Sequence, residues 1–227
     1  MVSLLCPSRR PESLRRLYES AVATANTDQW ELCVYVDWAD AGIQWNWLTG
    51  TPHLRYVVGP QQVLSNYWNC LARWAAGDIM GMLGDDVVMQ SQGWDTLLER
   101  MFAEYPDRIL FAFGWDGFRN ETHGSHGFVS REWVNALGRF TTPGFSHDYA
   151  DTWMNDVARA VNRWRYLPAL VTAHHHHEHP SLGVEFDHVY REGVERGQRD
   201  NCAARFNSPE WTAEIQEYAN KLRAVMS

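Results

Sequence analysis

Two adjacent carboxylates, Asp85 and Asp86, follow a short apolar run in the stretch IMGMLGDDVVMQSQGW. Asp37 takes the same position at the end of an earlier run, ELCVYVD. In an open α/β sheet, ligands bind beyond the carboxyl ends of the strands, so we expect these acids at the ligand-bearing edge. Adjacent carboxylates repel each other unless a cation or a donor compensates their charge, and oxygen ligands suit Mg²⁺ or Mn²⁺. The pattern indicates either a divalent-metal site or a solvated Gly-Asp-Asp turn.

A run of histidines, HHHHEH at 174–179, ends a later apolar stretch. On an extended strand the odd-numbered rings, His175, His177 and His179, share one face and the even-numbered rings take the other. Neutral imidazole is a good ligand for Mn²⁺, and a strand end can bring one ring towards Asp86. A solvated strand end is the alternative, and the spacing by itself leaves both interpretations open.

A sheet must hold these residues, and the hydrophobic pattern predicts one. The first half of the chain alternates strand-like runs with helix-like segments in the order β-α-β-β-α-β, which favours a mostly parallel sheet covered by helices. Strands are predicted over 2–6, 31–37, 54–58, 78–83, 108–115 and 165–177, and helices over 13–25, 60–77, 93–106, 130–140 and 148–163. We therefore expect an α/β single domain over 1–184, with a helical C-terminal extension over 185–227 packed on it.

Composition limits the class of protein. With 227 residues and 45% hydrophobic content, the chain is long enough for one substantial core. A net charge of −8 gives no electrostatic footprint for tight nucleic-acid binding, although a local basic groove is compatible with it. The four cysteines form no C-x-x-C pair and indicate buried thiols in a reducing compartment. No apolar run reaches membrane-spanning length and the start lacks a secretory pattern, so we expect a soluble, cytoplasmic protein without a membrane partner.

Three segments, VSLLCPSRRP, ELCVYVD and NCLARWAAGDIMGMLGDDVV, resemble the opening of the GT-A nucleotide-sugar glycosyltransferases, particularly the large family two and its bacteriophage relatives. In that family the first strand ends in a Pro-Ser/Thr turn and the second in a base-binding aspartate. An asparagine lies eight residues before a glycine that leads into a metal-binding D-x-D, as Asn69 precedes Gly77 here. The resemblance covers roughly residues 2–100 well. It implies a GT-A (Rossmann-like) fold, a divalent metal (Mn²⁺ or Mg²⁺) and a nucleotide-sugar donor, with a UDP-sugar expected.

The resemblance also implies residue roles at the donor site. The residues that it places near the nucleotide are Pro7, Ser8, Arg9, Asp37, Asn69 and Asp85. Asp86 would ligate the metal, while Asp85 would lie near the ribose or the sugar. The chain departs from the family at Gly84, which stands where the first aspartate of D-x-D is expected. Without the family resemblance, Arg9 is equally well interpreted as a solvated loop arginine. Asn69 is then interpreted as part of an exposed polar helix face.

Downstream segments resemble the acceptor side of the same family. FSHDYADTWMNDVAR is similar to the start of the helix whose carboxylate serves as general base in inverting members, which makes Asp148 and Asp151 candidates. HEHPSLG matches the H-x-H-P-x-x-G of the phage relatives. That match implies His177 or His179 as the third metal ligand.

The acceptor is less constrained. The phage-like pattern suggests 5-hydroxymethylpyrimidine in DNA, which would have to be flipped out of the duplex, and would put the enzyme in the host cytoplasm. The acidic charge of the chain argues against a DNA partner, so a cell-surface or phage-structural glycan remains an alternative.

Two other functions compete: a nucleotidyltransferase, although CPSRRPES lacks the expected glycines, and a non-catalytic sugar-binding module built on the twelve tryptophans. The sequence predicts neither the sugar nor the oligomeric state.

Overall fold

The apolar run at the N-terminus forms β1 (Val2–Pro7), the strand from which the parallel half of the sheet extends. A computed structural model describes residues 1–177, 186–206 and 208–227. In it β1 lies between β2 (Trp30–Asp37) and β4 (Ile79–Met82), parallel to both, and β3 (Leu54–Gly59) pairs in parallel with β2. These strands all end at one border of the sheet, because Pro7 pairs with Tyr35 and Asp37 with Gly59.

Strand direction reverses beyond β4. There β7 (Gly127–Ser130) runs antiparallel to β4, and β6 (Phe111–Trp115) runs antiparallel to β7. β8 (Trp164–His174) is parallel to β6, and the short β5 (Val87–Met89) pairs antiparallel with the end of β8. Within the described residues the sheet has eight strands in the order β3-β2-β1-β4-β7-β6-β8-β5. The predicted α/β fold with a mostly parallel sheet is confirmed.

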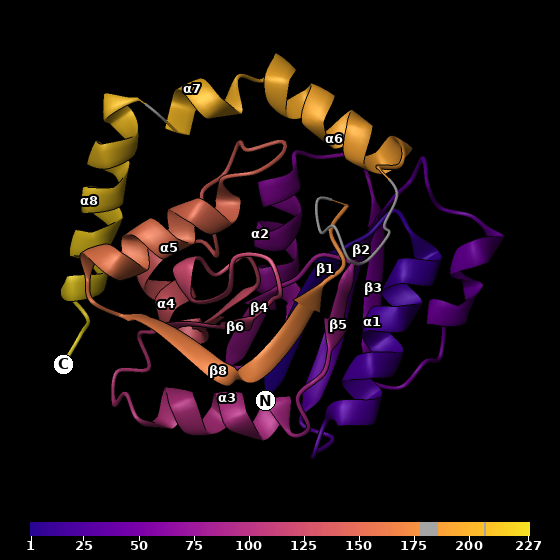
Figure 1. Cartoon of the computed structure of the whole chain (residues 1–227), viewed down its shortest axis with the longest axis horizontal. Coiled ribbons are helices and arrows are strands. Elements are labelled where there is room, and N and C mark those ends of the chain that lie inside the picture. Colours follow the sequence, from indigo (N-terminus) through magenta and orange to yellow (C-terminus); the bar gives the residue numbers. More distant parts are fainter. Residues whose placement is uncertain (178–185, 207) are drawn as a thin grey trace.

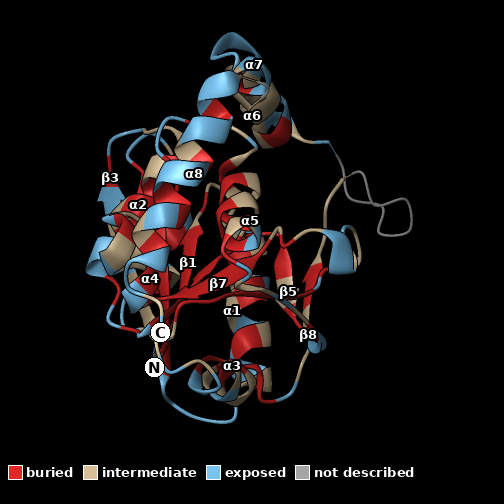
Figure 2. Ribbon diagram, turned by 90° about the vertical axis from the view of Figure 1, so that its left-hand side faces the viewer, coloured by how far each residue is buried: buried red, intermediate tan, exposed pale blue. Residues whose placement is uncertain are grey.

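Helices cover both faces of the sheet (Figure 1). One face packs against α2 (Leu64–Trp74), α4 (Arg131–Leu137), α5 (Ala150–Ala160) and α8 (Pro209–Arg223), and the other against α1 (Pro11–Thr24), α3 (Trp94–Ala103) and the 3-10 helix η1 (Ile43–Leu48). Successive side chains of a strand point to opposite faces, so Leu5 joins the first core and Leu4 the second. Figure 2 shows the result as buried strands beneath helices whose outer surfaces are exposed.

The C-terminal extension is helical, as predicted, and runs along one border of the molecule as α6 (His188–Arg199), α7 (Cys202–Phe206) and α8 (Figure 1). Trp211, Tyr218 and Leu222 of α8 are buried in the same core as α5. The helix α6 continues through Gly197 to Arg199. The boundary drawn between 184 and 185 falls outside the described residues and stays a prediction.

Two predicted helices begin later than the sequence pattern suggested: α2 at Leu64 rather than at 60, and α5 at Ala150 rather than at 148. Asp148 and Tyr149 have positive φ angles of 56° and 60°, which turn the chain sharply into α5. A further 3-10 turn, η2 (Asn120–Thr122), follows β6. In the described part of the chain, no helix combines the length and apolar character that crossing a membrane requires.

Candidate active site

A pocket of about 200 Å³ opens where the parallel strands end, and we call it the Asp37 pocket. The ends of β1, β2 and β4 form its floor, and α2 and α6 form its walls. The pocket brings together most of the residues that the sequence assigned to the nucleotide and the metal, namely Pro7, Ser8, Arg9, Asp37, Asp85 and Asp86. Residues up to 79 positions apart, from Pro7 to Asp86, therefore lie at one site, because the parallel strands that carry them end at the same border of the sheet.

Asp37 is buried at the end of β2. The hydroxyl of Tyr67 donates a hydrogen bond to Asp37 Oδ1 over 2.6 Å, and the rings of Tyr35 and Tyr67 lie 4.7 Å apart between their centroids. Burial raises the pKa of Asp37, while the hydrogen bond from Tyr67 lowers it. A buried carboxylate beside two aromatic rings offers a flat polar ligand both an acceptor and a surface to pack on.

Asp85 uses both of its carboxylate oxygens within the protein. Ser8 Oγ donates to Asp85 Oδ2 over 2.7 Å, and Arg10 Nε donates to Asp85 Oδ1 over 3.0 Å. Burial and the nearby charge of Asp86 raise the pKa of Asp85, and Arg10 opposes that rise. Arg10, which the sequence did not single out, thus supplies the cation that the paired acids require.

Asp86 faces a histidine on one side and α6 on the other. His174 Nε2 lies 3.4 Å from Asp86 Oδ1, while the hydroxyl of Tyr190 donates to Oδ2. Although burial acts to raise the pKa of Asp86, the contacts with His174, Arg10 and Tyr190 hold it well below its usual range. Asp86 is therefore a carboxylate at neutral pH.

Asp86, His126 and His174 form a cluster whose nearest ligand atoms all lie within 4.8 Å of one another. His126 is buried, and neither of its ring nitrogens has a hydrogen-bond partner among the described residues. Burial, with a smaller contribution from His174, lowers the pKa of His126 to about 4, so its imidazole is neutral and can donate a lone pair. One carboxylate and two imidazoles are a donor set that suits Mn²⁺, and the unpartnered nitrogens of His126 fit such an ion.

Gly84 explains how Asp86 reaches this cluster. A Cβ atom at position 84 would lie 2.5 Å from Asp86 Oδ1, closer than real Cβ contacts allow. The absence of a side chain lets the Asp86 carboxylate turn back towards His174 and His126. An aspartate at 84, where the family pattern places one, would therefore require the Asp86 carboxylate to shift.

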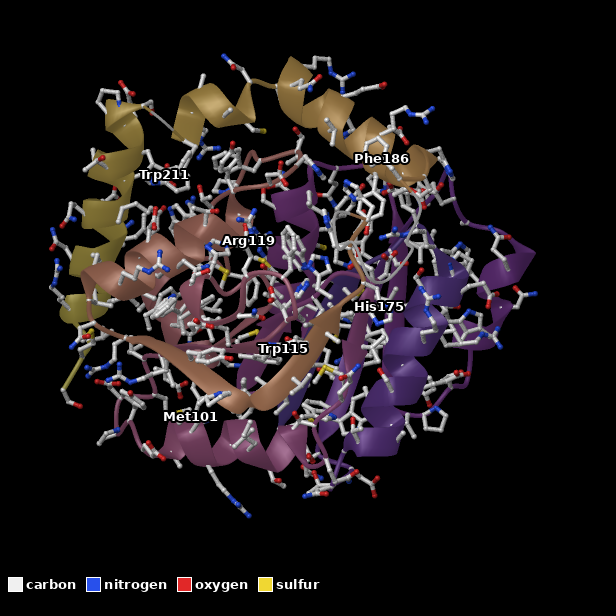
Figure 3. All side chains as sticks on the ribbon, viewed as in Figure 1. Met101, Trp115, Arg119, His175, Phe186 and Trp211 are labelled. Atoms are coloured by element: carbon white, nitrogen blue, oxygen red, sulfur yellow. The ribbon has the colours of Figure 1, made fainter. Side chains whose placement is uncertain are left out.

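The histidine of β8 in this cluster differs from the one that the sequence predicted. β8 ends at His174, so the predicted alternation does not extend to His177. The ring of His177 instead packs against Phe186 and Tyr190, with centroid distances of 4.7 and 4.4 Å, and Phe186 is labelled near α6 in Figure 3. The structure thus places His174, and not His177, in the cluster with Asp86, while metal ligation by His177 stays a prediction. His179 lies outside the described residues.

A second pocket, of about 190 Å³, lies on the other side of Asp86, and we call it the Asp151 pocket. His126, Asp148, Asp151 and His174 line it. The two pockets share Leu64, Trp68, Gly84, Asp86, His147 and Tyr190. The carboxylate and histidine cluster therefore sits at the junction of two ligand-sized spaces.

Two acids of the Asp151 pocket differ in their surroundings. His123 Nε2 donates to Asp151 Oδ2 over 2.8 Å, and 27% of the Asp151 side chain is exposed. Burial raises the pKa of Asp151, but the hydrogen bond and charge of His123 lower it further, so the pKa lies below its ordinary value. The Asp148 side chain is 67% exposed and lies 3.5 Å from His147 Nε2. Asp151 is the more enclosed of the two and the more firmly held.

Comparisons with known proteins agree with this arrangement. Neither a family model nor a curated protein sequence matches the chain. A solved structure that does is PcManGT, a mannosyltransferase from Pyrobaculum calidifontis in complex with GDP-Man and Mn²⁺. The TM-score is 0.62 at 15% identity, over 99% of this chain and 73% of that one. S. aureus TarS 1-349 gives a TM-score of 0.58 at 10% identity, over 97% and 69% of the two chains. Its complex with UDP-GlcNAc gives 0.58 at 10% identity, over 96% and 70%.

The chain has the GT-A fold of nucleotide-sugar glycosyltransferases. The likeness covers nearly all of the chain, including the C-terminal helices, whereas the sequence resemblance was good only to about residue 100. The resemblance to bacteriophage relatives stays a prediction.

Two predicted donor-site residues have structural partners instead of an open position in this GT-A fold. The amide of Asn69 donates to the carbonyls of Ser65 and Thr141 and accepts from the backbone N–H groups of Phe140 and Thr141. Asn69 therefore ties α2 to the loop before α5 and lines neither pocket.

Arg9 lines the Asp37 pocket, but its guanidinium pairs with Asp40 and with Glu192 of α6. It thus links the loop after β2 to α6. Sequence analysis missed the roles of Arg10, His123, His126 and Tyr190, which have no local pattern. The one available signal was the segment HGFVSREW, which begins with His126.

Proposed function

We propose that the protein is a metal-dependent glycosyltransferase that moves a sugar from a nucleoside diphosphate sugar to a hydroxyl acceptor. The observation that carries the proposal is that the two pockets meet at Asp86, which forms a cluster with His126 and His174 of the Asp151 pocket. Such a junction offers one space for a nucleotide, one for an acceptor, and a metal-binding group between them. The known complexes of similar fold, PcManGT with GDP-Man and Mn²⁺ and TarS with UDP-GlcNAc, support a nucleotide-sugar donor and a divalent ion.

In the donor half, Asp37 accepts a hydrogen bond from a nucleobase N–H, while Tyr35 and Tyr67 pack beside the base. Asp86, His126 and His174 hold the divalent ion, with Mn²⁺ or Mg²⁺ as candidates. Such an ion supplies Lewis-acid stabilisation of the charge that develops on the departing nucleoside diphosphate. The choice between a UDP-sugar and another nucleotide sugar follows from contacts to the base, and UDP stays our first expectation.

In the acceptor half, Asp151 is our candidate for the general base. A base must be ionised and within hydrogen-bond reach of the acceptor hydroxyl. Asp151 meets the first requirement because its pKa lies below the ordinary value, and it lines the pocket next to the metal-binding group. The role requires an inverting reaction. Asp148 is the second candidate, because it lines the same pocket at a more exposed position.

The acceptor that this site favours is a glycan hydroxyl. Asp148 and Asp151 place two carboxylates in the wall of the acceptor pocket, and the whole chain carries a net charge of −8. A phosphate-rich acceptor is repelled by such a surface unless basic groups compensate. The alternative acceptor, 5-hydroxymethylpyrimidine in DNA, rests on the phage-like sequence pattern alone. Transfer assays on hydroxymethylated DNA, unmodified DNA and a panel of glycans separate these acceptors.

The decisive experiment is a calorimetric titration with UDP and GDP in the presence and absence of Mn²⁺, followed by a nucleotide-sugar hydrolysis assay. We expect Mn²⁺-dependent binding of one nucleotide and release of that nucleotide from its sugar. Asp86→Asn is expected to lose the Mn²⁺ dependence, whereas Asp28→Asn, at a side chain that is 95% exposed, is the matched control. Absence of nucleotide binding with and without Mn²⁺ would refute the proposal. Release of pyrophosphate from a nucleoside triphosphate and a sugar phosphate would point to a nucleotidyltransferase instead.

A further inference from the structure

Arg10 places a guanidinium inside the acidic part of the Asp37 pocket. Its Nε and Nη2 both donate to Asp85 Oδ1, over 3.0 and 2.5 Å. Nη2 also lies 3.4 Å from Asp86 Oδ2, and Nη1 lies 3.7 Å from Asp187 Oδ2. The guanidinium carbon is 4.7 Å from the centre of the Tyr190 ring. Only 20% of this side chain is exposed, although it lines the pocket. A buried cation at this point needs an explanation that the acceptor chemistry does not give.

The contacts of Arg10 fall into two classes. Those with Asp85 are hydrogen bonds, and Asp85 is fixed in turn by Ser8 Oγ at 2.7 Å. Ser8 Oγ also accepts the backbone N–H of Arg10 over 3.1 Å. The contacts with Asp86 and Asp187, at 3.4 and 3.7 Å, are longer than good charge-assisted hydrogen bonds. Asp85 therefore holds the guanidinium through Nε and Nη2. Nη1 and the second N–H of Nη2, which face Asp187 and Asp86, are the donors that can take other partners.

We propose that Arg10 is a diphosphate-binding residue and that Asp85 is its positioning residue. The inference rests on the proposed function, because it assigns part of the donor site of that function. An arginine fork matches phosphate oxygens in a bidentate way and keeps its charge at every working pH. Nη1 and the second N–H of Nη2 exchange Asp187 and Asp86 for phosphate oxygens, while Nε and the first N–H of Nη2 stay on Asp85. This division gives Asp85 a role that does not include ligating the metal.

The proposal predicts effects of opposite sign in one variant. Arg10→Gln removes a phosphate-binding group, so the affinity for UDP or GDP at saturating Mn²⁺ falls by about tenfold or more. The same change removes a cation beside Asp86, so the affinity for Mn²⁺ in the absence of nucleotide rises. The control is Arg16→Gln, which removes an exposed positive charge from α1, the helix that begins directly after Arg10. Arg16→Gln is expected to change both affinities by less than about twofold, because distant exposed charges are screened.

The variant Asp85→Asn distinguishes a role of Asp85 in positioning Arg10 from an effect of the net charge of the pocket. If only net charge mattered, removing an acid from the pocket would strengthen the binding of an anionic nucleotide. Loss of the carboxylate that holds Arg10 instead weakens nucleotide binding. Because both oxygens of Asp85 are already used by Ser8 and Arg10, Mn²⁺ affinity in the absence of nucleotide is expected to stay within about twofold.

Calorimetry with UDP and GDP, and electron paramagnetic resonance of free Mn²⁺, measure these affinities on the full chain, with circular dichroism to verify folding. Arg10→Lys, which keeps the charge and loses the fork, is expected to recover part of the nucleotide affinity and serves if Arg10→Gln does not fold. Nucleotide affinity within twofold of wild type in the folded Arg10 variant, or tighter nucleotide binding by Asp85→Asn, overturns the inference. Failure of the wild-type chain to bind any nucleotide refutes the proposed function itself.

Discussion

The two pockets that meet at Asp86 compensate their acids in different ways. In the Asp37 pocket, the acids are paired with hydroxyl groups and a guanidinium: Tyr67 on Asp37, and Ser8 and Arg10 on Asp85. In the Asp151 pocket, the neighbouring donors are imidazoles, with His123 on Asp151 and His147 near Asp148. Arginine keeps its charge at any working pH, whereas histidine titrates near neutrality.

This difference suits the two halves of a transfer reaction. A nucleoside diphosphate carries a fixed negative charge, so its pocket needs partners with fixed charge and fixed hydrogen bonds. An acceptor hydroxyl must lose a proton, so its pocket needs a carboxylate whose proton affinity is adjustable. Asp86 belongs to both pockets, and its partners include a group of each kind, Arg10 and His174. The predictions below test whether the two halves separate in this way.

The largest expected effect is on the acceptor side alone. Asp151→Asn removes the general base, so turnover falls by about a hundredfold to ten-thousandfold. UDP or GDP binding is expected to match wild type, because Asp151 does not line the Asp37 pocket. Asp148→Asn, at the more exposed acid, is the matched comparison and should lose much less. Near-normal turnover in both variants would show that neither acid is the base.

The next effect concerns the metal-binding group that joins the halves. His126→Ala or His174→Ala removes a proposed ligand, and we expect Mn²⁺ affinity to fall at least about tenfold, as loss of even a supporting contact commonly does. His177→Ala is the control, because that ring packs on Phe186 and Tyr190 outside the cluster. Metal titration of the three variants decides the assignment. A loss confined to His177→Ala would restore the ligand that the sequence predicted.

Gly84→Ala makes a smaller change at the same point. The added methyl group would lie 2.5 Å from Asp86 Oδ1, so the carboxylate must turn away from His126 and His174. We expect weaker Mn²⁺ binding by about threefold to tenfold, with a smaller change in metal-free stability. Gly84→Asp, which would recreate the family's D-x-D pattern, is expected to weaken binding more. Tighter Mn²⁺ binding by Gly84→Asp would contradict this account of the site.

The donor half was the easier part to predict from sequence. Pro7, Asp37 and Asp86 each lie at or just beyond the end of an apolar strand, and parallel strands end at one border, so local patterns were enough to place them together. The histidine observed beside Asp86 is His174 and not the predicted His177, because β8 ends earlier than expected. The predicted strand ran to 177, whereas β8 stops at His174, and the alternation of faces beyond that point does not apply.

The groups that complete the site come from distant parts of the chain. Tyr190 contacts Asp86 across 104 residues, and Arg10 contacts Asp85 across 75. Local periodicity carries no information on such pairs, because it reports which face of an element is buried and not which element covers it. The polar pattern of the tail similarly predicted helices without showing that α6 lies over the pocket. Tertiary contacts hold α6 there, among them Tyr190 with Asp86 and Glu192 with Arg9.

The smallest expected effect concerns His123, the histidine that donates a hydrogen bond to Asp151 in the proposed acceptor half. The His123 hydrogen bond lowers the pKa of Asp151, whereas burial raises it, so His123→Ala is expected to raise that pKa. Because the carboxylate form is the base, activity falls as pH drops through this pKa, and the acidic limb of the kcat/KM profile moves to higher pH. His123→Gln keeps a donor and should show a smaller shift, while turnover at neutral pH changes less than about tenfold in both variants. A profile whose acidic limb does not move in His123→Ala would show that this histidine does not tune Asp151, and the contrast between the two pockets would then rest on geometry alone.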